Sequence, residues 1–314
     1  MTTTRQSVAT RETYGRTLLT MAEEHPDIVV LGGDLNVSTF VHLWRDQYPD
    51  RFFDFGPAEQ NIVGVAAGLA AAGKIPFVST FSVFGTGRPY DQLRVLISQP
   101  SLNVKLVCTH AGILTGEDGM SAHSIEDLSL MCALPSFSVT IPTDAPETEQ
   151  VIRAAAVTRG PQYVRLPRAA TPVVHSDGYQ FHPGKAEIMR AGGDVSIIAC
   201  GSLLAPALDA ADSLAGQSID ARVINLHTLA PADENAIIAA AEETGAIVTA
   251  EEHYVHGGLG SVVAGVVARN RPVPVEMVAL HGYTSSGPAN ELMVKNGLTS
   301  DGVAEAVHRV LKRK

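Results

Sequence analysis

Short runs of β-branched and other apolar residues alternate along the chain with alanine-rich stretches. In the first half of the chain, this pattern predicts strands at 28–31, 75–80, 104–109, 138–141 and 163–166, and helices at 12–24, 58–72, 91–98 and 146–158. Strands that are almost entirely apolar and alternate with helices indicate a parallel sheet covered on both faces.

The pattern breaks between residues 170 and 193, where Pro, His, Gly and Asp are frequent, and a second unit of the same kind follows. Its predicted strands are 195–200, 221–226, 246–250 and 275–279, and its predicted helices are 204–215, 233–241, 261–268 and 302–311. We therefore predict an α/β fold of two consecutive α/β domains with mostly parallel sheets. The expected boundaries are 1–175 and 190–314, joined by a linker at 176–189, and a length of 314 residues suits two domains.

The charge balance and the hydrophobic pattern of the chain exclude some classes of protein. Acidic residues outnumber basic ones by 33 to 23, which argues against a nucleic-acid partner. There is no apolar run of about 18 residues, so we expect no membrane span. The first residues show no signal-peptide pattern, and the three cysteines are far apart and form no CxxC pair. A cytoplasmic protein is the simplest expectation.

Common nucleotide-binding motifs are absent from the sequence. The turn VVLGGDLNVST lacks the GxGxxG pattern, and no GxxxxGK[ST] occurs. The glycine-rich stretch Gly257–Ser261 precedes a predicted helix, where an anion could bind. A tight turn leading into the helix is the better interpretation.

The segment 55–84 is the most informative part of the chain. It places Glu59 in the first turn of a predicted helix, where an acid on its own is ordinarily a solvated charge favoured by the helix dipole. One face of this helix carries only small residues and permits close approach of another helix: Gly64, Ala67, Gly68 and Ala71. Phe81 and Phe84 follow the next strand and on their own would be core aromatics.

Together, the order Gly-x-x-Glu, small-faced helix, strand and Phe-x-x-Phe resembles the pyrimidine-binding domain of transketolases. The resemblance continues through TGRPYDQLR, THAGILTGEDG, IEDLSLMCALP, PTDA, YVRLPR and, in the second domain, EEHYVHGGLGS. It covers nearly the whole chain and looks closest to the separate C-terminal subunits of split transketolases. It implies a thiamine-diphosphate-dependent transferase of carbohydrate metabolism, such as the pentose phosphate reactions, that moves a two-carbon ketol unit between sugar phosphates.

The resemblance assigns several residues to the cofactor. Glu59 matches the catalytic glutamate that bonds N1′ of the aminopyrimidine, Phe81 and Phe84 match the aromatics that pack on this ring, and Asp34 matches a further cofactor position. A carboxyl group held against apolar surface has a raised pKa and can share a proton at neutral pH. The cofactor supplies the electron sink, and the protein supplies position and polarity.

Other matches concern the substrate. Arg11, Ser38, His110 and Arg168 correspond to positions that hold the sugar phosphate, and Asp118 corresponds to an aspartate that reads a substrate hydroxyl. Arginine forks suit phosphate oxygens. His110 also stands as a catalytic candidate, because it closes a strand whose C-terminal end should face the active cleft.

One position departs from the family pattern. After GEDG the family usually has Ser or Thr and then His, but here Ala122 stands where that histidine is expected, and His123 is one position later. Either the loop shifts and His123 takes over in substrate binding, or the site lacks this donor.

The sequence contains no Gly-Asp-Gly triplet, which in these enzymes is followed by Asn and holds Mg²⁺ against the cofactor diphosphate. We therefore expect no metal ligands in this chain. A partner is implied: an N-terminal transketolase subunit with the GDG…N motif that supplies the Mg²⁺ ligands, most simply in an α2β2 heterotetramer.

Several alternatives stay open. A β subunit of a 2-oxo-acid dehydrogenase E1 component shares the domain pair but does not require the set Arg11, Ser38 and Arg168. Dependence of activity on the substrate phosphate would therefore distinguish a transketolase from this alternative. A relative of deoxyxylulose-phosphate synthase or a sulfosugar transketolase would differ in its donor. A non-catalytic family member would stay inactive with its partner.

Overall fold

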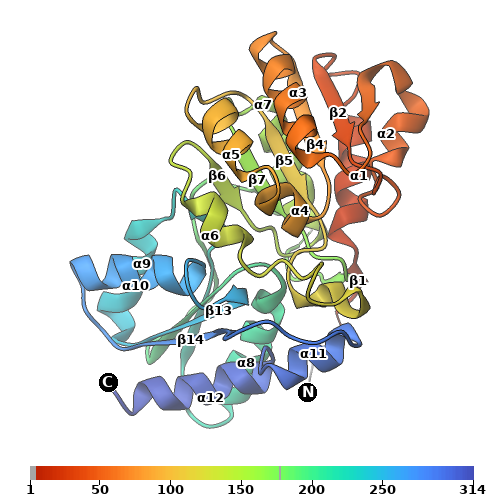
Figure 1. Ribbon diagram of the computed structural model, residues 1–314. Coiled ribbons are helices and arrows are strands. Elements are labelled where there is room, and N and C mark those ends of the chain that lie inside the picture. Colours follow the sequence, from red (N-terminus) through yellow and green to blue (C-terminus); the bar gives the residue numbers. More distant parts are fainter. Residues whose placement is uncertain (1–4, 177) are drawn as a thin grey trace.

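The computed structural model describes residues 5–176 and 178–314. The first four residues, to which the expectation of no signal peptide partly refers, lie outside the described part. The chain forms two α/β lobes, one from each half of the sequence (Figure 1).

The first lobe is built on a seven-stranded sheet in the order β12-β6-β7-β5-β4-β2-β3. Its strands are β2 (Ile28–Gly32), β3 (Phe52–Asp54), β4 (Ile75–Ser79), β5 (Lys105–Cys108), β6 (Ser138–Thr140), β7 (Gln162–Arg165) and β12 (Thr228–Ala230). All neighbouring pairs are parallel except β12 with β6. Parallel strands that are buried on both faces explain why the sequence runs here are apolar without alternation.

Helices cover both faces of this sheet. The first lobe contains α1 (Thr10–Thr20), α2 (His42–Gln47), α3 (Glu59–Ala71), α4 (Ser82–Gly87), α5 (Tyr90–Gln92), α6 (Asp127–Cys132) and α7 (Ala145–Val157), with a π-helix at Leu93–Ser98 and 3₁₀ helices η1 (Pro49–Arg51) and η3 (Ile113–Asp118). Leu18 of α1 and Ile152 of α7 pack on one face. Ile62 of α3 packs on the other face, while Gly64 and Gly68 of the same helix face open space.

The second lobe has a five-stranded sheet in the order β14-β13-β10-β11-β9. Its strands are β9 (Glu187–Arg190), β10 (Val195–Ala199), β11 (Ala221–Asn225), β13 (Ile247–Tyr254) and β14 (Val275–Leu280), and its helices are η4 (Gly201–Leu203), α8 (Leu204–Ala215), α9 (Glu234–Thr244), α10 (Leu259–Asn270), α11 (Ala289–Lys295) and α12 (Ser300–Leu311). Only β9 runs antiparallel to its neighbour. A mostly parallel α/β architecture in both lobes confirms the predicted fold class.

The lobes share strands and core. β9 begins inside the segment 176–189, and β12, which follows β11 in the second half, joins the sheet of the first lobe. Leu259 and Val263 of α10 belong to the same apolar cluster as Ile62 and Leu106. The short ribbon β1 (Ser7–Val8) with β8 (Thr171–Pro172) closes the N-terminal segment against the end of the first lobe.

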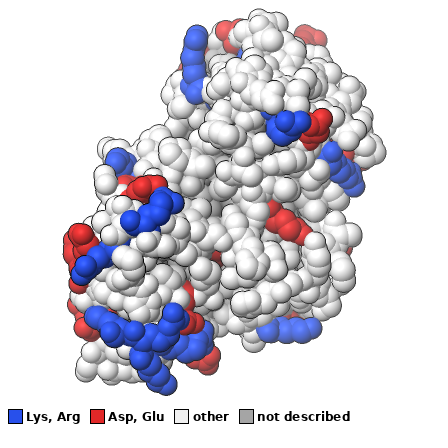
Figure 2. All heavy atoms as spheres, turned by 60° about the vertical axis from the view of Figure 1, so that its left-hand side comes forward, with Lys and Arg blue, Asp and Glu red and all other residues white. Residues whose placement is uncertain are grey.

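No helix in the described part of the chain is long and apolar enough to cross a membrane. On the face shown in Figure 2, most of the surface is uncharged, and Lys and Arg gather at the lower end. In the second lobe, Arg309 and Arg313 both pair with the same carboxylate, Glu276.

Candidate functional site

Most predicted site residues lie just beyond the C-terminal ends of parallel strands. Ser38 follows β2, Glu59 follows β3, Phe81 follows β4 and His110 follows β5. Arg168 follows β7. Because these strands are parallel neighbours, their C-terminal ends form one edge, which is where open α/β sheets bind ligands.

Glu59, the first residue of α3, has a buried carboxylate that meets an arginine. Arg88 Nη1 donates to both Glu59 oxygens, at 3.0 and 3.1 Å. The Arg88 guanidinium also lies 4.0 Å from the ring centre of Phe84. Arg88 itself is half-exposed and borders an open cavity of about 410 Å³ that Glu59 also lines. The buried Glu59 carboxylate is thus paired with a half-exposed arginine at the edge of this cavity.

Two aromatic rings and an imidazole continue from this pair. Phe81 stacks on Phe84, with ring centres 5.8 Å apart, and His110 stacks on Phe81, with ring centres 3.6 Å apart. His110 has a left-handed φ of 58°, and its Nδ1 lies 2.9 Å from the Thr109 hydroxyl. Burial, reinforced by the charges of Arg11 and Arg168, lowers the pKa of His110 to about 3. The ring is therefore neutral at pH 7 and offers hydrogen bonds without charge.

Two arginines lie beside His110. Arg11 donates to the carbonyl oxygens of Ser38 (2.7 Å) and Arg168 (3.0 Å), and Arg168 donates to the carbonyl of Thr115 (3.2 Å). Burial and the nearby Arg168 charge lower the pKa of Arg11. Arg11 is held by backbone carbonyls alone, whereas Arg168 also pairs with the exposed carboxylate of Glu117 at 3.3 Å. The two like charges are thus kept near each other, with one acidic partner at Arg168. An anion between them would relieve this repulsion.

Asp34 and Ser38 belong to the loop after β2. Asp34 is exposed and has a left-handed φ of 61°, and its amide donates to Asp54 Oδ1 at 3.1 Å. The Gly56 amide donates to the same oxygen at 3.0 Å. Although burial would raise it, these hydrogen bonds keep the pKa of Asp54 below its ordinary value. Asp54 therefore ties the Asp34 loop to the segment that starts α3.

Asp118 and His123 lie in the loop after His110. Asp118 is exposed at the end of η3. His123 is buried, and its Nε2 lies 2.8 Å from the carbonyl of Gly116, so it is engaged inside the loop. Ala122 is also buried. The structure thus brings His123 to the loop backbone and not to the stacked rings.

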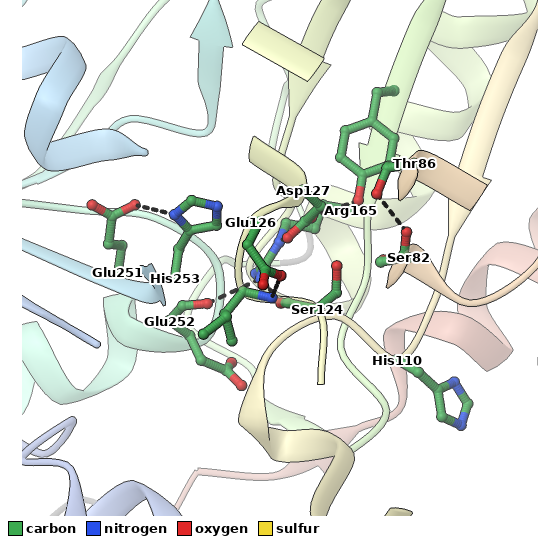
Figure 3. Close-up of polar contacts among 12 residues, drawn as sticks. Ser82, Thr86, His110, Ser124, Glu126, Asp127, Arg165, Glu251, Glu252 and His253 are labelled. Atoms are coloured by element: carbon green, nitrogen blue, oxygen red, sulfur yellow. Dashed lines mark hydrogen bonds and ion pairs between the residues drawn. The ribbon is translucent and has the colours of Figure 1, made fainter. Parts of the chain in front are cut away.

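Two neighbouring carboxylates of the second lobe, Glu251 and Glu252, point to different segments (Figure 3): Glu252 accepts from the amide of Leu114 in the loop after His110, and Glu251 binds the start of α10. Glu251 accepts from the amides of Leu259 (2.7 Å) and Gly260 (2.8 Å) at the start of α10. The possible anion site at Gly257–Ser261 is therefore filled by a carboxylate of the chain itself, which agrees with the preferred interpretation as a turn leading into a helix. Burial raises the pKa of Glu251 to about 7.

Sequence reasoning missed three residues that shape the site: Arg88, Asp54 and Glu252. Arg88 and Glu252 lie inside the motifs TGRPYDQLR and EEHYVHGGLGS, so the sequence indicates their positions but not their partners. Their contacts join segments 29 and 138 residues apart in sequence, which no local pattern reveals. Among the described residues, no group of three or more His, Cys, Asp or Glu is placed to hold a metal ion.

Two family descriptions match the chain. "Transketolase, pyrimidine binding domain" matches residues 6–173, and "Transketolase, C-terminal domain" matches residues 184–303. Between them they cover most of both lobes.

Individual proteins give the same picture. A Methanocaldococcus jannaschii protein named as a transketolase C-terminal section is 39% identical over 96% of this chain and 96% of its own length. The 6-deoxy-6-sulfo-D-fructose transketolase subunit SqwH of a Clostridium species is 41% identical over 97% of this chain and 95% of its own length. A solved structure described as "Split gene transketolase, inactive beta4 tetramer" superposes with a TM-score of 0.91 at 44% identity, covering 98% of this chain and all of that one.

Proposed function

Because the chain belongs to the transketolase family and carries its pyrimidine-binding and C-terminal domains, we propose that it is the C-terminal subunit of a two-chain, thiamine-diphosphate-dependent transketolase. The proposed reaction transfers a two-carbon ketol unit between sugar phosphates. The observation that carries the proposal is the continuous row of a buried carboxylate, two stacked phenylalanines, a neutral histidine and two neighbouring arginines. We propose a cytoplasmic location, consistent with the free thiols of all three cysteines.

The proposed cofactor fits the residues at one end of this row. A buried carboxylate, linked through Arg88 to the face of Phe84, offers a hydrogen-bond acceptor and a stacking platform for a flat, nitrogen-containing ring. When bound, thiamine diphosphate supplies the electron sink for the reaction. In this proposal Glu59 bonds and shares a proton with the pyrimidine nitrogen, Phe81 and Phe84 hold the ring plane, and Asp34 borders the same site.

The other end of the row suits a phosphorylated sugar. Arg11 and Arg168 provide fixed positive charge for the phosphate, with Ser38 beside them. In this proposal, His110 offers an uncharged imidazole to the sugar, and Asp118 forms a hydrogen bond with a substrate hydroxyl. His123 supports the loop that carries Asp118, through its contact with the Gly116 carbonyl.

Arg11→Ala and Arg168→Ala test this arrangement. A lost charge-assisted hydrogen bond costs about 1.5–3 kcal/mol, so we expect KM for xylulose 5-phosphate to rise roughly 10- to 150-fold, with a smaller change in kcat. Arg153→Ala, on an exposed surface of α7, is the matched control and should leave KM unchanged. Both site variants should discriminate poorly between a phosphorylated sugar and its unphosphorylated analogue. Unchanged preference for the phosphate would favour a function of the 2-oxo-acid dehydrogenase type.

A second candidate function is transfer from a sulfonated ketose. It is favoured by the similarity to the 6-deoxy-6-sulfo-D-fructose transketolase subunit. A sulfonate carries one negative charge where a phosphate carries up to two, and both have oxygens suited to arginine forks. Side-by-side kcat/KM values for xylulose 5-phosphate and 6-deoxy-6-sulfofructose would decide between the two donors.

A partner chain belongs to the proposed function. We propose an N-terminal transketolase subunit whose GDG…N motif holds Mg²⁺ and the cofactor diphosphate, most simply in an α2β2 assembly. The similar split-gene structure is described as an inactive β4 tetramer, and the inactivity of that β-only assembly supports dependence on a second kind of chain.

A further inference from the structure

The loop that carries the proposed substrate residue Asp118 is seated in the second lobe. The side chains of Ile113 and Leu114 belong to the apolar core of that lobe, together with Val248 and Leu292. Ser286, just before α11, donates from its hydroxyl to the carbonyl of Glu117 at 2.6 Å. In Figure 1, α11 lies against this part of the chain, in agreement with the contacts between α11 and η3. The first lobe thus supplies the loop, and the second lobe supplies the residues that hold it, which we call the seat of the loop.

Glu252 of β13 makes the central polar contact of this seat. One carboxylate oxygen accepts from the amide of Leu114, in the first turn of η3, at 2.7 Å, and the other accepts from the Ser202 hydroxyl at 2.6 Å. The Glu252 side chain is buried, and its carboxylate satisfies a backbone donor that has no partner within the turn. A side chain at Gly112 would reach within 2.1 Å of the same oxygen, and Gly112 also has a left-handed φ of 75°. The loop backbone and the carboxylate therefore fit each other closely.

The same strand also fixes the far end of the loop. Arg165 Nη2 donates to the carbonyls of Glu252 (2.9 Å) and Ser124 (3.2 Å), while its Nε pairs with Asp127 at 2.7 Å (Figure 3). The carbonyl of Ser124 in turn accepts from the amide of Gly112 at 2.8 Å. Both ends of the loop are thus tied to β13.

This seat connects to His110 through one residue. Thr115, next to Leu114, donates from its hydroxyl to the carbonyl of His110 at 2.8 Å. His110 has a left-handed φ that costs energy for a non-glycine residue, so it needs surrounding contacts to keep its position. Arg168 also bonds the carbonyl of Thr115, so a displaced η3 would disturb the proposed phosphate-binding arginines as well.

We propose that Glu252 is a positioning residue for substrate: its carboxylate, supplied by the C-terminal domain, holds η3 so that His110, Asp118 and Arg168 face the sugar phosphate. Its link to turnover rests on the proposed function above. The second lobe thereby has a part in the site, although all the substrate and cofactor residues predicted from the sequence lie in the first lobe.

Neighbouring carboxylates make a matched experiment possible. Glu252→Ala removes the contact with η3, whereas Glu251→Ala removes an equally buried carboxylate that holds α10 and not the loop. Glu252→Gln keeps an oxygen that can accept from Leu114. Amide hydrogen exchange on the full-length chain should rise at least about 10-fold over residues 113–118 in Glu252→Ala, stay near wild type there in Glu251→Ala, and return toward wild type in Glu252→Gln.

In the complex with its partner chain, Glu252→Ala should raise KM for xylulose 5-phosphate by about 10- to 100-fold, while Kd for thiamine diphosphate stays within about twofold. Unchanged exchange over 113–118, or an equal rise in Glu251→Ala, would overturn the inference. A parallel loss of cofactor affinity and melting temperature would show a merely structural role and would equally overturn it. If the wild-type complex transfers no ketol unit, the proposed function fails, and the exchange data still decide whether Glu252 fixes the loop.

Discussion

Arg88 makes both contacts that the proposed function gives to the aminopyrimidine ring of the cofactor. Its guanidinium bonds both oxygens of Glu59 and lies over the face of Phe84. A guanidinium is flat, delocalised and rich in N–H donors, so it suits a carboxylate and an aromatic face in the same way as an aminopyrimidine edge. If the cofactor binds as proposed, the arginine and the aminopyrimidine ring cannot both occupy this position, and Arg88 would have to move.

Removing this side chain should therefore favour the cofactor. A half-exposed ion pair contributes about 0.2–1 kcal/mol, so Arg88→Ala should lower Kd for thiamine diphosphate roughly 1.5- to 5-fold. Arg94→Ala removes the same charge from an exposed pair with Asp91 and should leave Kd unchanged. Isothermal titration calorimetry of the complex with its partner chain would measure Kd for thiamine diphosphate in both variants. Weaker binding in Arg88→Ala would mean that the arginine assists the cofactor.

Glu59→Gln tests the proposed proton-sharing role. Gln keeps the size of the side chain but cannot exchange a proton as a carboxyl group does. A positioned proton-transfer group contributes about 10²- to 10⁴-fold, so kcat should fall by that factor while the complex stays folded. Melting temperature and co-elution of the two chains are the controls. Retention of more than about a tenth of wild-type kcat in the folded complex would contradict the assignment.

Ala122 and His123 give a third prediction at the residue scale. Since His123 Nε2 is engaged by the Gly116 carbonyl, we expect its loss to loosen the loop and not to remove a proton donor. His123→Ala should therefore lower the melting temperature and change kcat on the best donor less than about tenfold. Ala122→His should improve kcat/KM for xylulose 5-phosphate, recovering part of the roughly 2–4 kcal/mol that one positioned donor supplies.

The opposite pattern is also measurable. If His123→Ala abolishes turnover at unchanged melting temperature, and Ala122→His brings no gain, then His123 acts directly on the substrate.

At the scale of elements, length and periodicity decided what the sequence could predict. The helix expected at 58–72 is α3, which is one residue shorter at each end. The helix expected at 204–215 is α8, and its bounds are the predicted ones. The six-residue helices α2, α4 and α6 were missed, because they are too short to show a period and depend on tertiary contacts. β13 runs to Tyr254, four residues beyond the strand predicted at 246–250, since buried charged residues interrupt its apolar pattern.

For the candidate site as well, the sequence predicted local features and missed the contacts between distant segments. The resemblance marked residues on each loop, and the parallel sheet brings most of those loops to one edge. The ion pair of Glu59 with Arg88 and the seat of η3 on Glu252 depend on packing between distant segments, which the pattern does not encode.

Lys105 joins two elements and gives a prediction about pH. This side chain of β5 is fully buried, and its Nζ donates to the carbonyls of Thr158 (2.7 Å) and Gly160 (2.8 Å), just after α7. Burial lowers the pKa of Lys105 to about 7, whereas in the unfolded chain it is about 10.4. Between these values the unfolded state binds one more proton, so stability should increase as pH rises.

Lys105→Met isolates this contribution. From pH 7 to 9, the free energy of unfolding of wild type minus that of Lys105→Met should increase by at most about 1.4 kcal/mol per pH unit. Below pH 7, where both states carry the charge, the difference should level off. Chemical denaturation at each pH would measure it, with Lys74→Met as an exposed control. A difference that does not change with pH would show that the carbonyl contacts keep the ammonium charged.

At the scale of the whole molecule, both lobes contribute to the proposed site, which is incomplete in this chain. The first lobe presents the row of proposed site residues along one sheet edge, and the second lobe seats the loop that completes the row. In the proposed function, this arrangement offers a platform for the cofactor pyrimidine and two arginines for the substrate phosphate. In the same proposal, the cofactor diphosphate is held by Mg²⁺ with oxygen ligands, and this sequence contains no GDG motif to supply them.

We therefore expect the purified chain to show no ketol transfer by itself. With xylulose 5-phosphate, ribose 5-phosphate, thiamine diphosphate and Mg²⁺, its rate should equal that of a reaction without protein. Adding the chain that carries GDG…N should restore turnover, and the activity should saturate at one partner per chain if the assembly is α2β2. Light scattering on the same mixtures would give the mass of the active species. A partner whose GDG aspartate is changed to alanine should still bind but restore nothing, because it cannot hold the metal. Clear turnover by the rigorously pure single chain would contradict the proposal that the site is shared.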